Sequence, residues 1–230
     1  MSHPDSHSPP PGFQEPTSLR FGEVRVRNRG RLPHWEKESG LYFLTFHLAD
    51  SLPKSVLKKI AERHQILVAV KEKGARLLPE KKELLEDYSH RKIEEYFDRG
   101  SGSCAPGDPR IAGSMAAALR FWHGKRYRLL AWCNMPNHVH VVARLFPGQQ
   151  LAAIIKSWKL HSAKAANQTL GRSGSFWQRE YYDHLVRSQD ELDHAIRYVL
   201  ENPAKAGLRD WVWVWSSEGA TFSPSPERTP

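Results

Sequence analysis

The stretch that decides the fold is residues 127–145, YRLLAWCNMPNHVHVVARL. Two runs rich in apolar and β-branched residues, near Tyr127–Cys133 and His138–Leu145, flank the tripeptide Met135-Pro136-Asn137. Proline presets one turn dihedral and asparagine tolerates an unusual one, so the tripeptide predicts a bend between two neighbouring strands.

Further elements are expected on both sides of this hairpin. They are a core strand at Gly40–Leu48, a helix from Pro109 to about His123 capped by Asp108, a helix at Gln149–Asn167, a strand at Tyr181–Val186, and a helix from the capping box Ser188–Glu191 to about Glu201. Asn202-Pro203 is expected to end the last helix. The order strand, helix, strand, strand, helix, strand predicts an α+β, ferredoxin-like fold with helices on an antiparallel central sheet.

One folded domain is expected over residues 20–215, between disordered tails at 1–19 and 216–230. Residues 54–98 hold eleven Lys/Arg and nine Asp/Glu interleaved with aliphatic residues, which predicts a helical insertion of solvated amphipathic helices. Two cysteines cannot form a disulfide framework, so reduced thiols in a cytoplasmic protein are expected. We find no signal peptide and no apolar run of membrane-spanning length, so no membrane partner is expected.

Positive charge is concentrated in one part of the chain. The net charge is +9, and residues 120–187 hold eleven Lys/Arg but only two acids, Glu180 and Asp183. A local excess of cations suits a polyanion, because Lys and Arg bind phosphates and release their counterions. Nucleic acid is therefore the expected partner, with a merely soluble basic surface as the alternative.

His138-Val139-His140 is the sharpest local feature. Side chains alternate faces along a strand, so both imidazoles project the same way while Val139 points into the core. Two adjacent imidazoles can hold a divalent metal. With twelve histidines in the chain, such a spacing also arises by chance, and two unrelated surface histidines remain the alternative.

Tyr198 and Asn202 lie four residues apart on the last predicted helix, and so share one face. An apolar stripe lies beside them, formed by Leu192, Ala195, Ile196 and Val199. Alone, this pattern favours Tyr198 as a half-buried aromatic residue next to the stripe. A chemical role requires the helix to face the two histidines.

Several separate segments, which follow one another in a fixed order, carry a family resemblance over roughly residues 20–215. Residues 131–142, AWCNMPNHVHVV, resemble the HUH motif (His, hydrophobic residue, His) of the IS200-like transposases. Three further segments resemble the REP-associated tyrosine transposases: RLPHW at 31–35, FWQREYYDH at 176–184 and RYVLENPAKAG at 197–207.

The resemblance implies a single-tyrosine DNA transposase. It assigns Mg²⁺ or Mn²⁺ to His138, His140 and Asn202, although many relatives carry Gln at the last position. It makes Tyr198 the nucleophile that forms a 5′-phosphotyrosine, and it implies single-stranded, hairpin-containing (REP-like) DNA as the substrate. It further implies no nucleotide cofactor and a monomer or homodimer.

Candidate DNA contacts are the basic residues near this site with one aromatic residue: Lys156, Lys159, Lys164, Arg172, Arg179, Arg187 and Trp177. Tyr181 and Tyr182 are rival nucleophiles, but they lie in a predicted strand. A catalytically silent DNA- or RNA-binding protein of the same fold is the main alternative. A histidine-triad hydrolase lacks its third histidine here, and a zinc site using Cys104 and Cys133 lacks a CxxC spacing.

Overall fold

The computed structural model describes residues 24–28, 33–51 and 102–217. The predicted insertion, the N-terminal tail and nearly all of the C-terminal tail lie outside the described residues. A five-stranded sheet forms the centre, in the order β6-β3-β5-β4-β7. Its strands are β3 (Leu41–His47), β4 (Tyr127–Asn134), β5 (His138–Leu145), β6 (Tyr182–Leu185) and β7 (Val214–Ser216). All neighbouring pairs in this sheet are antiparallel.

The connections confirm the predicted α+β, ferredoxin-like order. The helices are α3 (Pro109–Arg120), α4 (Leu151–Thr169) and α5 (Gln189–Lys205), with a short 3-10 turn η1 (Ala105–Gly107) before α3. α3 links β3 to β4, and α4 links β5 to β6. In each case an antiparallel strand lies between the two linked strands, which is the split βαβ arrangement. A separate hairpin pairs β1 (Val24–Asn28) with β2 (Pro33–Lys37).

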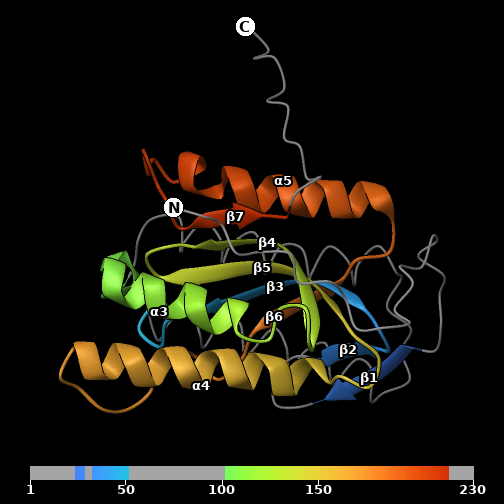
Figure 1. Cartoon of the computed structure of the whole chain (residues 1–230), viewed down its shortest axis with the longest axis horizontal. Helices are drawn as coiled ribbons and strands as arrows, with labels where there is room; N and C mark the ends of the chain where they lie inside the picture. The colour runs from blue at the N-terminus through green and yellow to red at the C-terminus, as the bar shows by residue number, and fades with distance from the viewer. Residues whose placement is uncertain (1–23, 29–32, 52–101, 218–230) are drawn as a thin grey trace, which may run out of the picture.

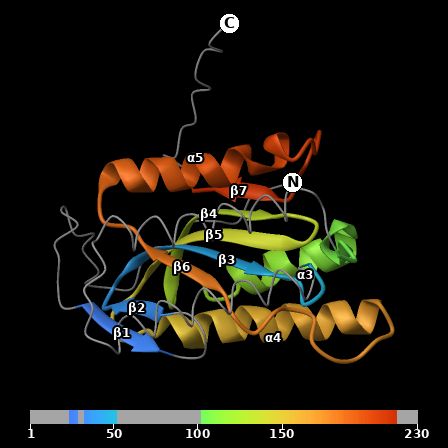
Figure 2. The same ribbon diagram turned by 180° about the vertical axis from the view of Figure 1, so that it is seen from behind.

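The helices cover opposite faces of the sheet. α3 and α4 lie on one face and α5 on the other, as Figure 1 and the reverse view in Figure 2 show. The larger hydrophobic cluster lies on the α3 and α4 side and includes Val139, Val141 and Trp158. The smaller one, between the sheet and α5, includes Phe43 and Val142. The alternation of β5 between the two clusters therefore assigns each of its side chains to a face.

Two predicted caps are confirmed at the helix starts. The Asp108 carboxylate accepts a hydrogen bond from the backbone N–H of Arg110, at 2.8 Å. The Ser188 hydroxyl accepts one from the N–H of Glu191, at 3.1 Å. Each side chain satisfies an N–H that the first turn of a helix leaves without a partner.

The predicted end of the last helix is wrong. α5 continues through Pro203 to Lys205 instead of ending at about Glu201. Proline removes only one hydrogen bond this close to the end of a helix, and the N–H of Ala206 still donates to the carbonyl of Asn202, at 3.0 Å. Asn202 is thus a helical residue one turn beyond Tyr198.

β7 and the β1–β2 hairpin are elements that the sequence interpretation did not include. Of the helices that the structure describes, none combines the length and the apolar character needed to cross a membrane.

Candidate active site

The two histidines of β5 lie on the face of the sheet that α5 covers. His138 and His140 are each 1% exposed, and Val139 between them packs in the opposite cluster, as predicted. Their Nε2 atoms are 2.9 Å apart. Two nitrogen ligands of one ion, each about 2.1 Å from it, lie about 3 Å apart when they are neighbours in an octahedral geometry. The spacing of the pair therefore fits a shared divalent ion.

The other ring nitrogen of each histidine has a polar partner. His138 Nδ1 lies 2.7 Å from Asn137 Oδ1, and His140 Nδ1 lies 2.8 Å from Thr45 Oγ1. Both partner oxygens can accept from an Nδ1–H group, and this tautomer leaves the Nε2 lone pairs facing each other. Thr45 reaches His140 because the two residues are opposite each other in the β3–β5 register.

Burial keeps the His138 ring neutral. Desolvation lowers the pKa of His138 from its ordinary value to about 3, while the nearby Asn202 side chain acts in the opposite direction. A neutral imidazole is the form that can ligate a metal ion. The environment therefore favours ligation over protonation at physiological pH.

Asn202 supplies a third polar group at this place. It is 2% exposed, and its Oδ1 makes no well-formed hydrogen bond to the residues that the structure describes. A buried carbonyl oxygen without a partner is costly, and a bound cation would satisfy it. The amide oxygen is the kind of ligand that Mg²⁺ and Mn²⁺ prefer, and neutral imidazole is a general ligand of divalent ions. The residues thus fit the metal that the family resemblance implies.

Tyr198 packs directly against His140, one of the two histidines of β5. Its ring meets His140 edge-on, with ring centroids 5.2 Å apart, and meets Phe43 in the same manner at 5.7 Å. The Lys205 ammonium lies 5.6 Å from the centroid of the Tyr198 ring and also pairs with Glu201 at 2.8 Å. The condition for a chemical role of Tyr198 is therefore met, because α5 faces the histidines.

The rival tyrosines lie at different places. Tyr181 packs against the cluster on the far face of the sheet, whereas Tyr182 lies on the α5 side, beside Phe43.

No group of three or more His, Cys, Asp or Glu residues in the described part of the chain could hold a metal ion. The described residues therefore give no support to a zinc site with Cys104 and Cys133, which the missing CxxC spacing also disfavours.

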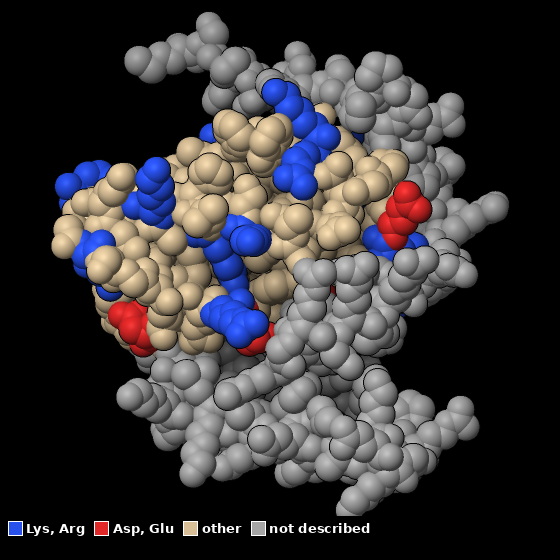
Figure 3. All heavy atoms as spheres, turned by 90° about the horizontal axis from the view of Figure 1, so that it is seen from below, with Lys and Arg blue, Asp and Glu red and all other residues tan. Residues whose placement is uncertain are grey.

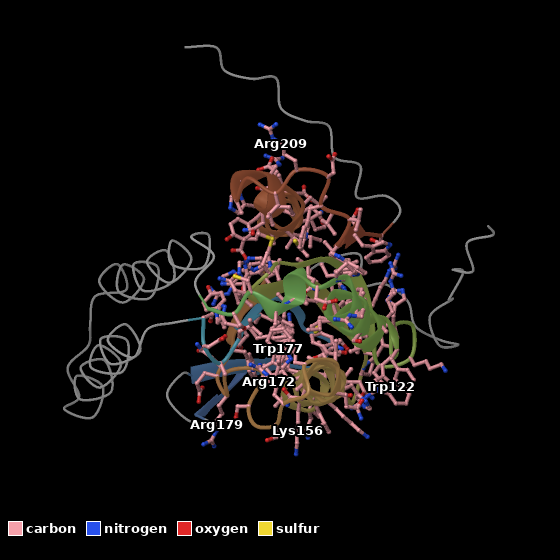
Figure 4. All side chains as sticks on the ribbon, turned by 90° about the vertical axis from the view of Figure 1, so that its left-hand side faces the viewer. Trp122, Lys156, Arg172, Trp177, Arg179 and Arg209 are labelled. Carbon is pink, nitrogen blue, oxygen red and sulfur yellow. The ribbon has the colours of Figure 1, made fainter. Side chains whose placement is uncertain are left out.

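The candidate DNA contacts divide into two groups. The exposed ones are Lys156, Lys164, Arg172, Arg179 and Arg187. The view from the α4 side in Figure 3 shows Lys and Arg spread over the described surface, with few acids among them. Figure 4 places Lys156 beneath α4, on the far side of the sheet from α5 and Arg209.

Trp177 and Lys159 are corrections to the set of DNA contacts. Trp177 is 6% exposed, and its indole N–H donates to Ser162, so it belongs to the core and cannot stack on DNA. The Lys159 ammonium donates to the carbonyls of residues 178, 179 and 180, at 3.0 to 3.2 Å. It fastens the segment before β6 instead of standing free on the surface.

Four residues at the site were missed from the sequence: Thr45, Asn137, Phe43 and Lys205. Asn137 directly precedes His138, and this adjacency was the one available signal. Thr45 is 95 residues from His140, and only the strand register reveals the contact. Lys205 was missed because the helix was predicted to end before it.

Comparisons with known proteins agree with the resemblance. Residues 117–202 match the family model described as "Transposase IS200 like". A Haemophilus influenzae protein named as a REP-associated tyrosine transposase is 27% identical over 103 residues, which cover 40% of this chain and 58% of that protein. The REP-associated tyrosine transposase of Escherichia coli is 23% identical over 99 residues, covering 43% and 58%.

One solved structure, of a REP-associated tyrosine transposase bound to a REP hairpin, aligns with a TM-score of 0.43 and 14% identity, over 91% of this chain and 99% of that chain. The chain spans 58% of the length of each of the two named relatives. The resemblance stated from the sequence is confirmed, and the family model locates it at residues 117–202.

Proposed function

Residues 117–202 match the IS200-like transposase family, and from this premise we propose that the chain cleaves and rejoins single-stranded DNA through Tyr198. The observation that carries the proposal is the contact of Tyr198 with His140, at 5.2 Å between ring centroids. It brings a nucleophile and a pair of potential metal ligands, from two separate elements, into one buried site.

The proposed cofactor is Mg²⁺ or Mn²⁺, held by His138, His140 and Asn202. When bound, such an ion withdraws charge from a non-bridging phosphate oxygen and orients the phosphate for attack. Asn137 and Thr45 fix the two rings by binding their Nδ1 atoms, at 2.7 and 2.8 Å.

Tyr198 then displaces the 3′ oxygen from the phosphorus of the scissile phosphate. Its phenolic oxygen loses a proton and bonds to the phosphorus, while the bond from phosphorus to the 3′ oxygen breaks. The leaving strand takes up a proton as a 3′ hydroxyl, and the 5′ phosphate stays on Tyr198 as an ester. A 3′ hydroxyl can later attack this ester and release Tyr198, because the bond energy has been conserved.

Lys205 assists the same step. Its ammonium lies over the Tyr198 ring and stabilises the negative charge that develops on the phenolic oxygen.

The proposed substrate is single-stranded DNA with a hairpin. The names of the two relatives support a REP-type substrate, and the basic excess in residues 120–187 supports a polyanion.

The test is a covalent adduct assay. Purified protein is incubated with labelled single-stranded hairpin oligonucleotides taken from repeats near its own gene, with Mn²⁺ or with EDTA. We expect a denaturant-resistant adduct and a product with a free 3′ hydroxyl, both abolished by Tyr198→Phe, His138→Ala and EDTA. Tyr182→Phe is the matched control and should leave the adduct intact.

Two outcomes would contradict the proposal. An adduct that persists in Tyr198→Phe makes the nucleophile wrong, and Tyr182 is then the next candidate on this face of the sheet. DNA binding without any adduct or cleavage favours a binding-only protein of the same fold.

A further inference from the structure

The helical layer formed by α3 and α4 contains no acidic side chain. Between Asp108 and Glu180 the sequence has no Asp or Glu, whereas it holds eleven Lys and Arg residues. The exposed cations of this layer include Arg120, Lys156 and Lys164. Phosphate groups approaching this side of the molecule therefore meet no carboxylate from either helix.

Exposed apolar and aromatic side chains lie together at one place on this layer. Phe121, which caps the C-terminus of α3, is 64% exposed, and Leu160 on α4 is 62% exposed. The Phe121 ring meets Trp122 edge-on, with centroids 4.8 Å apart, and lies 6.3 Å from the exposed His161 ring of α4. Exposed apolar side chains that lie together and are rimmed by polar residues are typical of an interaction site.

Cations surround these rings. The Arg126 guanidinium lies 5.8 Å from the centroid of the Trp122 ring. Arg120 and Lys125 are exposed and lie close to Phe121 in the sequence. Lys164 is exposed on α4, one helical turn after His161. Figure 4 shows Trp122 at the edge of the α3 and α4 layer, across the sheet from α5. We name this group the α3–α4 surface, and it comprises Arg120, Phe121, Trp122, Lys125, Leu160, His161 and Lys164.

We propose that the α3–α4 surface binds an unpaired stretch of DNA, with a base stacking on the exposed Phe121 ring and phosphates held by the neighbouring cations. Exposed aromatic rings interleaved with cations form the usual platform for single strands, since every base has a face that can stack. An apolar protein partner would leave the cations without a counterpart. The inference rests on the proposed function for the choice of DNA, and it adds a contact on the sheet face opposite Tyr198.

The test measures binding without chemistry. The full-length Tyr198→Phe protein is titrated, in EDTA, into a fluorescent single-stranded oligonucleotide, and affinity is read by anisotropy. Adding Phe121→Leu, which keeps an apolar group and removes the ring, should weaken binding about tenfold. Adding Lys125→Gln and Lys164→Gln should lower the slope of log affinity against log salt by about 0.7 for each phosphate that the protein no longer neutralises.

Controls separate a local effect from misfolding and from catalysis. Val212→Ala removes an exposed apolar side chain after α5, and should leave the affinity unchanged. Phe121→Leu should leave the melting temperature within a few degrees of the parent, because the ring is mostly in solvent. A 2-aminopurine base in the oligonucleotide should lose fluorescence on binding the parent but not Phe121→Leu.

Unchanged affinity and unchanged 2-aminopurine quenching in Phe121→Leu would overturn the proposal. So would equal affinity for duplex DNA, or a preference for RNA of the same sequence. Because these measurements use neither metal nor Tyr198, failure of the adduct assay would leave them intact, and the reverse also holds.

Discussion

Thr45 offers the sharpest test of the candidate site, because its hydroxyl contacts His140 Nδ1 and must change from donor to acceptor when His140 ligates a metal ion. In the metal-free protein the 2.9 Å contact between the Nε2 atoms requires one of them to carry a proton. His138 uses its Nδ1–H to donate to Asn137, so the shared proton belongs to His140 Nε2, and His140 Nδ1 then accepts from the Thr45 hydroxyl. Ligation through both Nε2 atoms reverses this bond, and Thr45 must accept from His140 Nδ1–H.

Thr45→Val removes the hydroxyl and nearly preserves the shape of the side chain. The metal-bound state then buries an Nδ1–H without a partner, which costs about 1–3 kcal/mol, while the metal-free state leaves a weaker unpaired acceptor. A net loss of about 1.4 kcal/mol corresponds to about a tenfold weaker affinity for Mn²⁺, as is usual for residues that orient metal ligands.

The assay is a Mn²⁺ titration of the full chain, followed by calorimetry or by the loss of free-ion electron paramagnetic resonance signal. Thr45→Ser keeps the hydroxyl and should retain most of the affinity, whereas Thr45→Val should not. If Thr45→Val folds normally and binds Mn²⁺ as tightly as the parent, the hydroxyl has no part in orienting His140, and the assignment of the ring nitrogens is wrong.

Three further changes test other parts of the site and the core. Asn202→Ala should reduce the rise in melting temperature that Mn²⁺ produces, measured against the metal-free form of the same variant, because it removes a proposed ligand. Lys205→Gln should slow single-turnover adduct formation about tenfold with little effect on DNA affinity, because the charge acts on the developing phenolate. Burial raises the pKa of Tyr127 from 10 to about 12. The protonated phenol therefore contributes fully to the free energy of unfolding below pH 10. This contribution is lost, at up to about 1.4 kcal/mol per pH unit, as the pH rises towards 12. Urea unfolding between pH 8 and 11 should therefore show a steeper alkaline loss than in Tyr127→Phe; equal slopes would contradict the assigned shift.

The sequence predicted the elements whose signals are local. β5 matches its predicted range because a run rich in apolar and β-branched residues extends over its length. Asp108 and Ser188 were identifiable because capping depends on residue type and a fixed offset. β7 has only three residues and was missed, because so short a segment carries no alternating pattern that could identify it.

The candidate site was only partly predictable, because its parts meet through long-range packing. Period-two alternation places His138 and His140 on one face, and the i to i+4 spacing does the same for Tyr198 and Asn202. Neither rule says which face of the sheet α5 covers. Trp177 shows the opposite error: it was grouped with the basic residues as a candidate for stacking on DNA, yet its ring packs edge-on against Phe46, at 5.0 Å.

The basic layer of α3 and α4 and the Tyr198 site lie on opposite faces of the sheet, and this arrangement has a physical basis. Metal-ligating imidazoles must stay neutral, and the desolvation that lowers the pKa of His138 to about 3 requires a site closed by α5 and the sheet. Cations that bind phosphates must instead remain in solvent, because burying them without partners is costly. Both needs are met when the acid-free layer of α3 and α4 lies on one face of the sheet and the Tyr198 site on the other.

We therefore expect substitutions on the two faces to act independently, so that the free-energy effects of Phe121→Leu on DNA affinity and of Thr45→Val on Mn²⁺ affinity add in the double variant. A measured coupling larger than about 0.5 kcal/mol would show that the two surfaces communicate through the sheet.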